Sequence, residues 1–354
     1  MSEKEKSEIV GNQYGDATAM AQESTAIQAN VDKYADFRAY AYAREKEIFN
    51  HVNDLYKATR AEMKCESTTP PELDMPTITM DCDDYADGAI ASYNGFSITF
   101  YQRANKIFTE MRNAEAHCDT AMAEKLQYYL DEIIGHELGH ALSHTIFFNS
   151  DSKYDYENGI YRRRDDGMAE LIGFYAAQKA NGKPIENNSV ADAMLGVVLE
   201  KQESVIEYNR ILLTQWQSLT NKEKLEKIKD IDLHTARSIY YDYAILGFAE
   251  ALKSNPDMDL AEFIKTALTK PASLDGMNKH VLKIGGAAKE LEKMDGDKQQ
   301  QAFMKMLRQE KDKVDEKQVQ EELRLQTELS TAMVDEAAAL LKKKAQHKKS
   351  NHKG

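Results

Sequence analysis

The segment DEIIGHELGHALSH, residues 131–144, places side chains capable of metal binding and acid–base chemistry inside an apolar helical pattern. His136 and His140 are four residues apart, so on an α-helix both imidazoles project from one face toward a common point. Two imidazoles in this arrangement suit a tetrahedral zinc ion. Glu137 follows the first histidine and lies at the flank of that face, where it can reach a water on the metal without binding the metal. The pattern therefore predicts a zinc site with Glu137 as the general base.

Two histidines leave the metal short of a third protein ligand. His144 is on the same side of the helix, but it lies about 12 Å along the axis from His136 at 1.5 Å per residue, so we expect it at the rim of the site, in a supporting role or simply on the surface. Glu170 is the predicted third ligand, because it interrupts an apolar run in a second helix, DGMAELIGFYAA. Gly139 lacks a side chain where another element could approach the first helix closely.

Two acidic residues, Asp165 and Asp166, stand just before the second predicted helix, at residues 167–180. Aspartate is favoured at the N-cap of a helix, where its carboxylate accepts a hydrogen bond from a free backbone N–H. Either carboxylate could also accept a proton from the second nitrogen of a ligand histidine. The two roles are compatible, and the sequence leaves both open.

The β signals are confined to one part of the chain. TITM at residues 77–80, GAIASY at 88–93 and FSITFYQ at 96–102 each have strand character. Asn94-Gly95 separates the last two and is the two-residue signal of a type I′ hairpin. Helical periodicity dominates elsewhere, including residues 17–63. We predict a strongly α-rich α+β fold, in which a small antiparallel sheet packs on the helix that carries HELGH.

HELGH followed by GMAELIG at residues 167–173 resembles the gluzincin zinc metallopeptidases, which include thermolysin-like enzymes, minimal metallopeptidases and lethal-factor-type toxin proteases. The resemblance implies that one zinc ion per chain is bound by His136, His140 and Glu170, with Glu137 as the general base. It further implies hydrolysis of peptide bonds in a protein substrate, held along the edge strand at 88–93.

Other features of the resemblance concern the loop before the second helix. Members of the family often use a tyrosine or histidine to stabilise the tetrahedral intermediate, and Tyr161 is our choice for that catalytic role over Tyr154 and Tyr156. The chain departs from thermolysin at Phe174, where thermolysin has an aspartate four residues after the ligand glutamate. The similarity covers residues 77–180 only.

Four regions follow from these patterns. A helical N-terminal region spans 1–66, the metallopeptidase-like core 67–185, a helical region 186–285, and a charged helical region with a basic tail 286–354. Heptad spacing in the last region is patchy, which favours a long solvated helix pair over a coiled coil. These flanks could dock a partner, and the alternative to an enzyme is a helical interaction or assembly protein that retains a zinc scaffold.

Composition limits the compartment and the partners. The formal net charge of −13 argues against nucleic acid, because phosphate binding requires a basic footprint. No apolar run approaches the roughly 20 residues that a membrane span needs, and MSEKEKSEIV lacks the apolar core of a secretory signal. We expect a cytoplasmic protein, with non-classical export left open. Cys65, Cys82 and Cys118 are too scattered for a disulfide framework and are expected to be reduced thiols.

Overall fold

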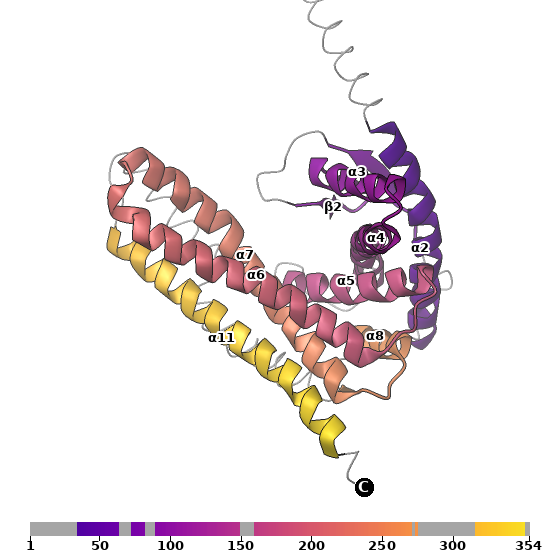
Figure 1. Ribbon diagram of the computed structural model, residues 1–354. Helices are drawn as coiled ribbons and strands as arrows, with labels where there is room; N and C mark the ends of the chain where they lie inside the picture. The colour runs from indigo at the N-terminus through magenta and orange to yellow at the C-terminus, as the bar shows by residue number, and fades with distance from the viewer. Residues whose placement is uncertain are drawn as a thin grey trace, which may run out of the picture.

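The computed structural model describes residues 34–63, 72–81, 89–148, 159–270, 273–274 and 316–350, and these residues are mainly helical (Figure 1). The α-rich α+β prediction is confirmed. The helices are α2 (Ala35–Glu62), α3 (Gln102–Ala116), α4 (Thr120–Phe148), α5 (Gly159–Ala180), α6 (Asn187–Gln215), the 3-10 turn η1 (Trp216–Ser218), α7 (Asn221–Ser254), α8 (Leu260–Thr269) and α11 (Glu316–Ser350). Within the described residues, no helix combines the length and apolar character needed to cross a bilayer.

The sheet has three short strands in the order β1-β3-β2. The hairpin of β2 (Ala91–Tyr93) and β3 (Ser97–Phe100) is antiparallel, as predicted. The prediction of a wholly antiparallel sheet is wrong for β1 (Thr77–Met80), which runs parallel to β3. Pairing in this register sets Ile78 beside Ile98, and both side chains are buried. The parallel pairing of β1 with β3 thus buries both isoleucines. Because β3 lies between β1 and β2, β2 is an edge strand of the sheet.

The hairpin turn is shifted by one residue from the prediction. Gly95 has a left-handed φ of +99°, whereas Asn94 and Phe96 do not, which is the φ pattern of a type II′ turn centred on Gly95-Phe96. The Asn94 side-chain oxygen accepts hydrogen bonds from the N–H groups of Phe96 at 3.1 Å and Ser97 at 2.9 Å. Asn94 therefore stabilises the turn with its side chain instead of occupying a central position.

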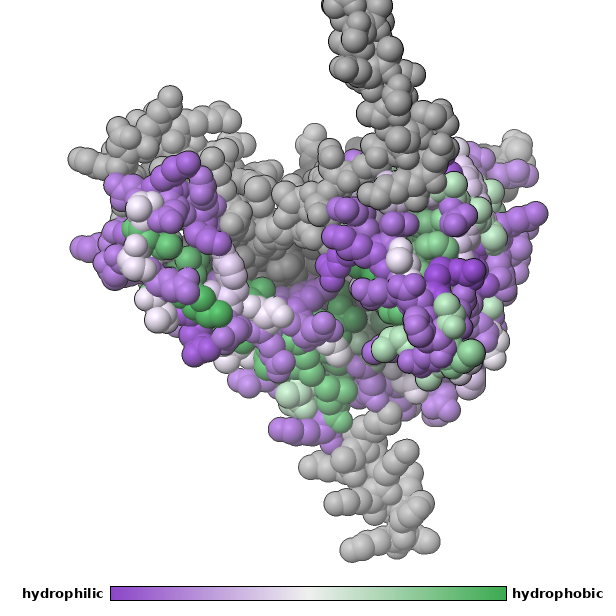
Figure 2. Space-filling model, turned by 45° about the horizontal axis from the view of Figure 1, so that its top comes forward, coloured by the Kyte–Doolittle hydropathy of each residue, from purple (hydrophilic) through white to green (hydrophobic). Residues whose placement is uncertain are grey.

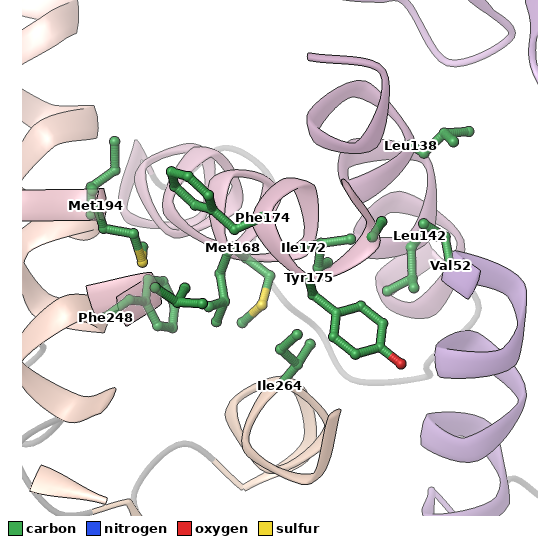
Figure 3. Packing of buried hydrophobic residues seen from close by; sticks show 14 of the residues in the cluster. Val52, Leu138, Leu142, Met168, Ile172, Phe174, Tyr175, Met194, Phe248 and Ile264 are labelled. Atoms are coloured by element: carbon green, nitrogen blue, oxygen red, sulfur yellow. The ribbon is translucent and has the colours of Figure 1, made fainter. Parts of the chain in front are cut away.

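Helix α5 is at the centre of the core and contacts α2, α4, α6, α7 and α8. Figure 3 shows its buried side chains pointing to different neighbours: Ile172 and Tyr175 lie on the side of α4 and α2, whereas Met168 and Phe174 lie toward α6 and α7. Buried residues of α2, α8 and α11 belong to the same cluster. Residues from all four predicted regions therefore contribute to one hydrophobic core.

Helix α5 begins at Gly159, several residues before the predicted start at 167. Asp165 and Asp166 therefore lie inside the helix, and the prediction that they cap it is wrong. Aspartate is unfavourable within a helix by a fraction of a kcal/mol, which the contacts of Asp166 described below can offset. Residues 149–158 of the predicted polar loop, with Tyr154 and Tyr156, lie outside the described residues.

Helices α6, α7 and α11 pack side by side and form what we call the three-helix arm (Figure 1). On the face that Figure 2 shows, the surface of the described residues is largely hydrophilic. The predicted solvated helix pair is not what the described part of the C-terminal region forms, because α11 buries a stripe with alternating spacings of four and three residues. The buried residues of this stripe are Val319, Leu323, Gln326, Ser330, Met333, Ala337 and Leu340.

A buried carboxylate connects the helices that surround the HELGH segment. Asp131 of α4 is fully buried and accepts hydrogen bonds from the Arg44 guanidinium of α2 at 2.8 and 2.6 Å. Asn181, just after α5, donates to the same carboxylate at 2.8 Å. Removing one partner of such a buried pair typically costs about 3–5 kcal/mol. This network fixes α4 relative to α2 and to the end of α5.

Glu45 of α2 is a second buried carboxylate, but no cation among the described residues offsets its charge. Its side chain is fully buried, and neither carboxylate oxygen has a hydrogen-bond partner among the described residues. Burial raises the pKa of Glu45 to about 7. The folded protein therefore holds a proton that the unfolded chain releases near pH 4.5, so ionisation of Glu45 destabilises the fold as the pH rises between these values.

We expect Glu45→Gln to be more stable than the wild type at pH 8, by about 2 kcal/mol, because the neutral amide needs no deprotonation in the core. The gain should disappear below pH 4.5, where both forms are neutral. Urea unfolding at pH 4.5 and pH 8 measures the difference. Glu110→Gln, at an exposed position on α3, is the matched control. A gain from Glu45→Gln that does not depend on pH would contradict the expectation.

Candidate metal centre

Helices α4 and α5 come into direct backbone contact at small residues. A Cβ placed on Gly139 of α4 would lie 2.8 Å from the Cα of Ala169 on α5. One turn earlier, a Cβ on Gly135 would lie 3.0 Å from the Cα of Gly173. The close approach expected at Gly139 is confirmed. Gly135 and Gly139 directly precede His136 and His140 on α4. The close contact therefore brings these histidines up to the acidic residues of α5.

The two histidines meet Asp166 at one point. The Nε2 atom of His140 is 3.1 Å from Oδ1 of Asp166, and the Nε2 atom of His136 is 3.8 Å from the same oxygen. One ligand atom from each of the three residues lies within 4.8 Å of the others. Ligands of a tetrahedral zinc ion are about 3.3 Å apart when each bond is about 2.0–2.1 Å long. Small movements of the side chains would therefore bring these atoms to metal-binding distances.

Glu170 lies on the other side of the His136 ring. Its Oε2 atom is 3.0 Å from Nδ1 of His136, the nitrogen that points away from Asp166. A carboxylate in this position accepts a hydrogen bond from Nδ1–H, which orients the ring so that Nε2 faces Asp166. The structure thus brings Asp166, and not the predicted ligand Glu170, to the point shared by both histidines.

Opposing effects of burial and ion pairing set the pKa values of these groups. Burial alone would raise the pKa of Asp166, but hydrogen bonds from His136 and His140 outweigh it and hold the pKa well below its usual range. Burial would lower the pKa of His136, yet its contacts with Asp166 and Glu170 raise it to about 9. The same contacts thus lower the pKa of Asp166 and raise the pKa of His136, so the cluster favours a positive charge between the two carboxylates.

Glu137 lies next to this cluster and is anchored by the edge strand. The backbone N–H of Tyr93 on β2 donates a hydrogen bond to the Glu137 carboxylate. Burial raises the pKa of Glu137, while the charges of His136 and His140 lower it; the net change is upward. The predicted base therefore sits in a buried position between the two histidines and the strand.

The hydrogen bonding of the hairpin shows which groups of β2 face outward. Asn94 donates to Ser97, and Tyr101 donates to Ile90. Even-numbered residues of β2 therefore pair with β3, so the N–H and C=O groups of Ala91 and Tyr93 point away from the sheet. The outward N–H of Tyr93 is the one that bonds Glu137, so the outer edge of β2, with which no other described strand pairs, lies beside the cluster.

His144 lies beneath the hairpin and not with the other two histidines. Its ring packs edge-on against Tyr93, with ring centroids 6.2 Å apart. The prediction that His144 is too far along the helix to join the other two is consistent with this position. It supports the strand whose backbone holds Glu137.

Tyr161, the predicted stabiliser of the tetrahedral intermediate, falls within the backbone of α5, but its side chain lies outside the described residues. The described residues instead add charged groups that sequence reasoning missed. Lys201 of α6 lies 3.6 Å from the buried Asp242 of α7, and its charge is one of the influences that lower the pKa of Glu170 against the effect of burial. They come from helices outside the predicted core, and no local pattern marked them.

Comparison of this chain with protein-family models, curated proteins and solved structures gives no significant match. The function of the centre is therefore argued from its own geometry.

The α4–α5 contact can be tested with a pair of glycine substitutions. Gly139→Ala should destabilise the protein by about 1–3 kcal/mol, because the added methyl group meets backbone that must move. Gly196→Ala on α6 is the control: an added Cβ meets nothing within 4 Å, so the change should stabilise by about 0.5–1 kcal/mol. Chemical denaturation of both variants measures the two effects. Equal stabilisation by both would show that α4 and α5 are not in close contact.

Proposed function

We propose that the protein is a zinc-dependent peptidase, with His136, His140 and Asp166 as metal ligands and Glu137 as the general base. The observation that carries the proposal is the convergence of two imidazoles and a carboxylate beside a buried glutamate at the edge of a strand. This donor set fits zinc, which accepts nitrogen and oxygen ligands in tetrahedral sites, and three protein ligands leave a fourth position open. In this proposal Asp166 binds the metal and Glu170 supports His136, which is the reverse of the roles predicted from the sequence.

The bound zinc would act as a Lewis acid and lower the pKa of a coordinated water toward about 7. With zinc held by His136, His140 and Asp166, Glu137 would accept a proton from the attacking water and deliver it to the leaving amine as the peptide C–N bond breaks. Its hydrogen bond from Tyr93 fixes one end of the carboxylate, which leaves the other oxygen for proton transfer. Glu170 holds the His136 ring so that Nε2 faces the metal position.

The outer edge of β2, unpaired among the described strands, supports a peptide as the substrate. The outward N–H and C=O of Ala91 can pair with the backbone of an extended chain, as in strand addition. Strand β2 has only three residues, so it can pair with the main chain of a substrate over a short segment only. Such recognition favours an unstructured segment of a protein and places few demands on its side chains.

The ligand assignment predicts different losses for two conservative substitutions. Asp166→Asn should weaken zinc binding by more than about 100-fold, because an amide replaces a charged ligand, whereas Glu170→Gln should weaken it about 10–100-fold as the loss of an outer partner. Competition with a chromophoric chelator measures both affinities, with circular dichroism as the check on folding. A larger loss for Glu170→Gln would assign the ligand role to Glu170.

Glu137→Gln should retain one zinc ion per chain and lose peptide hydrolysis by at least about 10²-fold, since the amide cannot accept the proton. Metal analysis and mass spectrometry of a mixed pool of unstructured peptides provide the two measurements. Cleavage that survives the substitution would remove Glu137 as the base. Zinc bound in full by a wild type that cleaves nothing would favour the alternative, an interaction protein with a metal scaffold.

A further inference from the structure

We propose that His144 is a positioning residue for the general base Glu137: its ring supports the hairpin, and the hairpin holds the Glu137 carboxylate through the backbone N–H of Tyr93. The inference rests on the proposed function. It goes beyond that function in giving the third histidine of residues 131–144 a part in the reaction that requires neither a bond to the metal nor a proton transfer.

The His144 ring contacts two parts of the hairpin. It packs edge-on against the Tyr93 ring of β2, with ring centroids 6.2 Å apart. A Cβ placed on Gly95 would lie 4.0 Å from Cε1 of His144, so the backbone of the turn lies close to the same imidazole. His144 is one helical turn beyond the proposed ligand His140 on α4. The end of the hairpin is thus held against α4 next to the metal position.

The two parts that His144 contacts are joined to each other. The Tyr93 hydroxyl donates a hydrogen bond of 2.7 Å to the carbonyl oxygen of Gly95. Within the same turn, the Asn94 side-chain oxygen accepts hydrogen bonds from the N–H groups of Phe96 and Ser97. These bonds restrain the turn relative to the end of β2. Support at the turn therefore also bears on the position of the Tyr93 backbone.

The Tyr93 backbone connects this support to the general base. Its outward N–H donates a hydrogen bond to the Glu137 carboxylate. Strand β2 has three residues and pairs with β3 along one edge, and such a short hairpin is marginally stable by itself. Packing of Tyr93 on His144 holds the other edge against α4. Because a displacement of about 1 Å can cost about 100-fold in rate, loss of this packing should reach the reaction through Glu137.

A chemical role for the imidazole would have a different signature. A histidine that donated a proton or a hydrogen bond to the substrate would need its ring nitrogens. Support of the hairpin needs only a flat ring that packs against Tyr93. Phenylalanine keeps a ring and lacks the nitrogens, so His144→Phe separates positioning from direct chemistry, whereas His144→Ala removes both.

Amide hydrogen exchange of Tyr93 in the full-length protein tests the support independently of catalysis. His144→Ala should speed this exchange about 10-fold, because the amide loses the packing that keeps its hydrogen bond closed, and His144→Phe should restore most of the protection. Glu137→Ala removes the acceptor and should speed the exchange as well. In that background, His144→Ala should change the rate less than about 2-fold, because both residues act on one hydrogen bond.

Peptide hydrolysis and zinc content give the second readout. His144→Ala should lower kcat about 10-fold with one zinc ion still bound per chain, and His144→Phe should recover most of kcat. KM should stay within about 2-fold, because Ala91, whose outward groups would pair with the substrate, lies at the opposite end of β2 and is paired with Phe100. His51→Ala on α2 is the matched control, since His51 is also a partly buried histidine within a helix.

Unchanged exchange of the Tyr93 amide in His144→Ala would overturn the inference while leaving the proposed function intact. A loss of kcat that His144→Phe fails to recover would do the same by assigning a chemical role to the imidazole, and a loss confined to KM would do so by placing His144 in substrate binding. A wild type and a His51→Ala variant that bind zinc in full and cleave no peptide would overturn the proposed function and this inference with it.

Discussion

Backbone contact between α4 and α5 is the constraint on which the geometry of the centre depends. Side chains at Gly139 or Gly135 would force these helices apart, because the facing backbone lies within 3.0 Å of where the added carbon would stand. The histidines of α4 and the acids of α5 have the same four-residue spacing. Side chains with the same spacing on two helices in contact can face each other in pairs. His136 therefore meets Glu170, and His140 meets Asp166.

Local patterns in the sequence were sufficient for the elements that carry the chemistry. HELGH lies on a helix, Gly139 allows a second helix to approach, and the following helix supplies the acid. The hairpin was found for the same reason, because alternating apolar residues around Asn94-Gly95 are a short-range signal. What these features share is that each is decided by neighbours within a few positions along the chain.

Local sequence patterns could not predict features that depend on how the helices pack against one another. Asp166 and Glu170 are one turn apart on the same face, so the choice between them depends on a sliding of about 5.4 Å between α4 and α5. The Ala169 and Gly173 contacts fix that position, and they are visible only in the fold. In α11, Gln326 and Ser330 occupy buried positions of a heptad pattern, and these polar residues made the pattern seem interrupted.

Other buried polar residues join the helices of the arm to one another. Asn209 of α6 donates to Thr327 of α11 at 3.3 Å, and Gln202 of α6 donates to Asp242 of α7. Polar groups inside a helical bundle lower its stability but can select one register, because any other register leaves them without partners. A shift of α6 by one turn would carry Lys201 about 5.4 Å along the helix axis, away from its partner Asp242 on α7. The polar contacts of the arm thus favour one register of its helices, which hydrophobic packing alone does not specify.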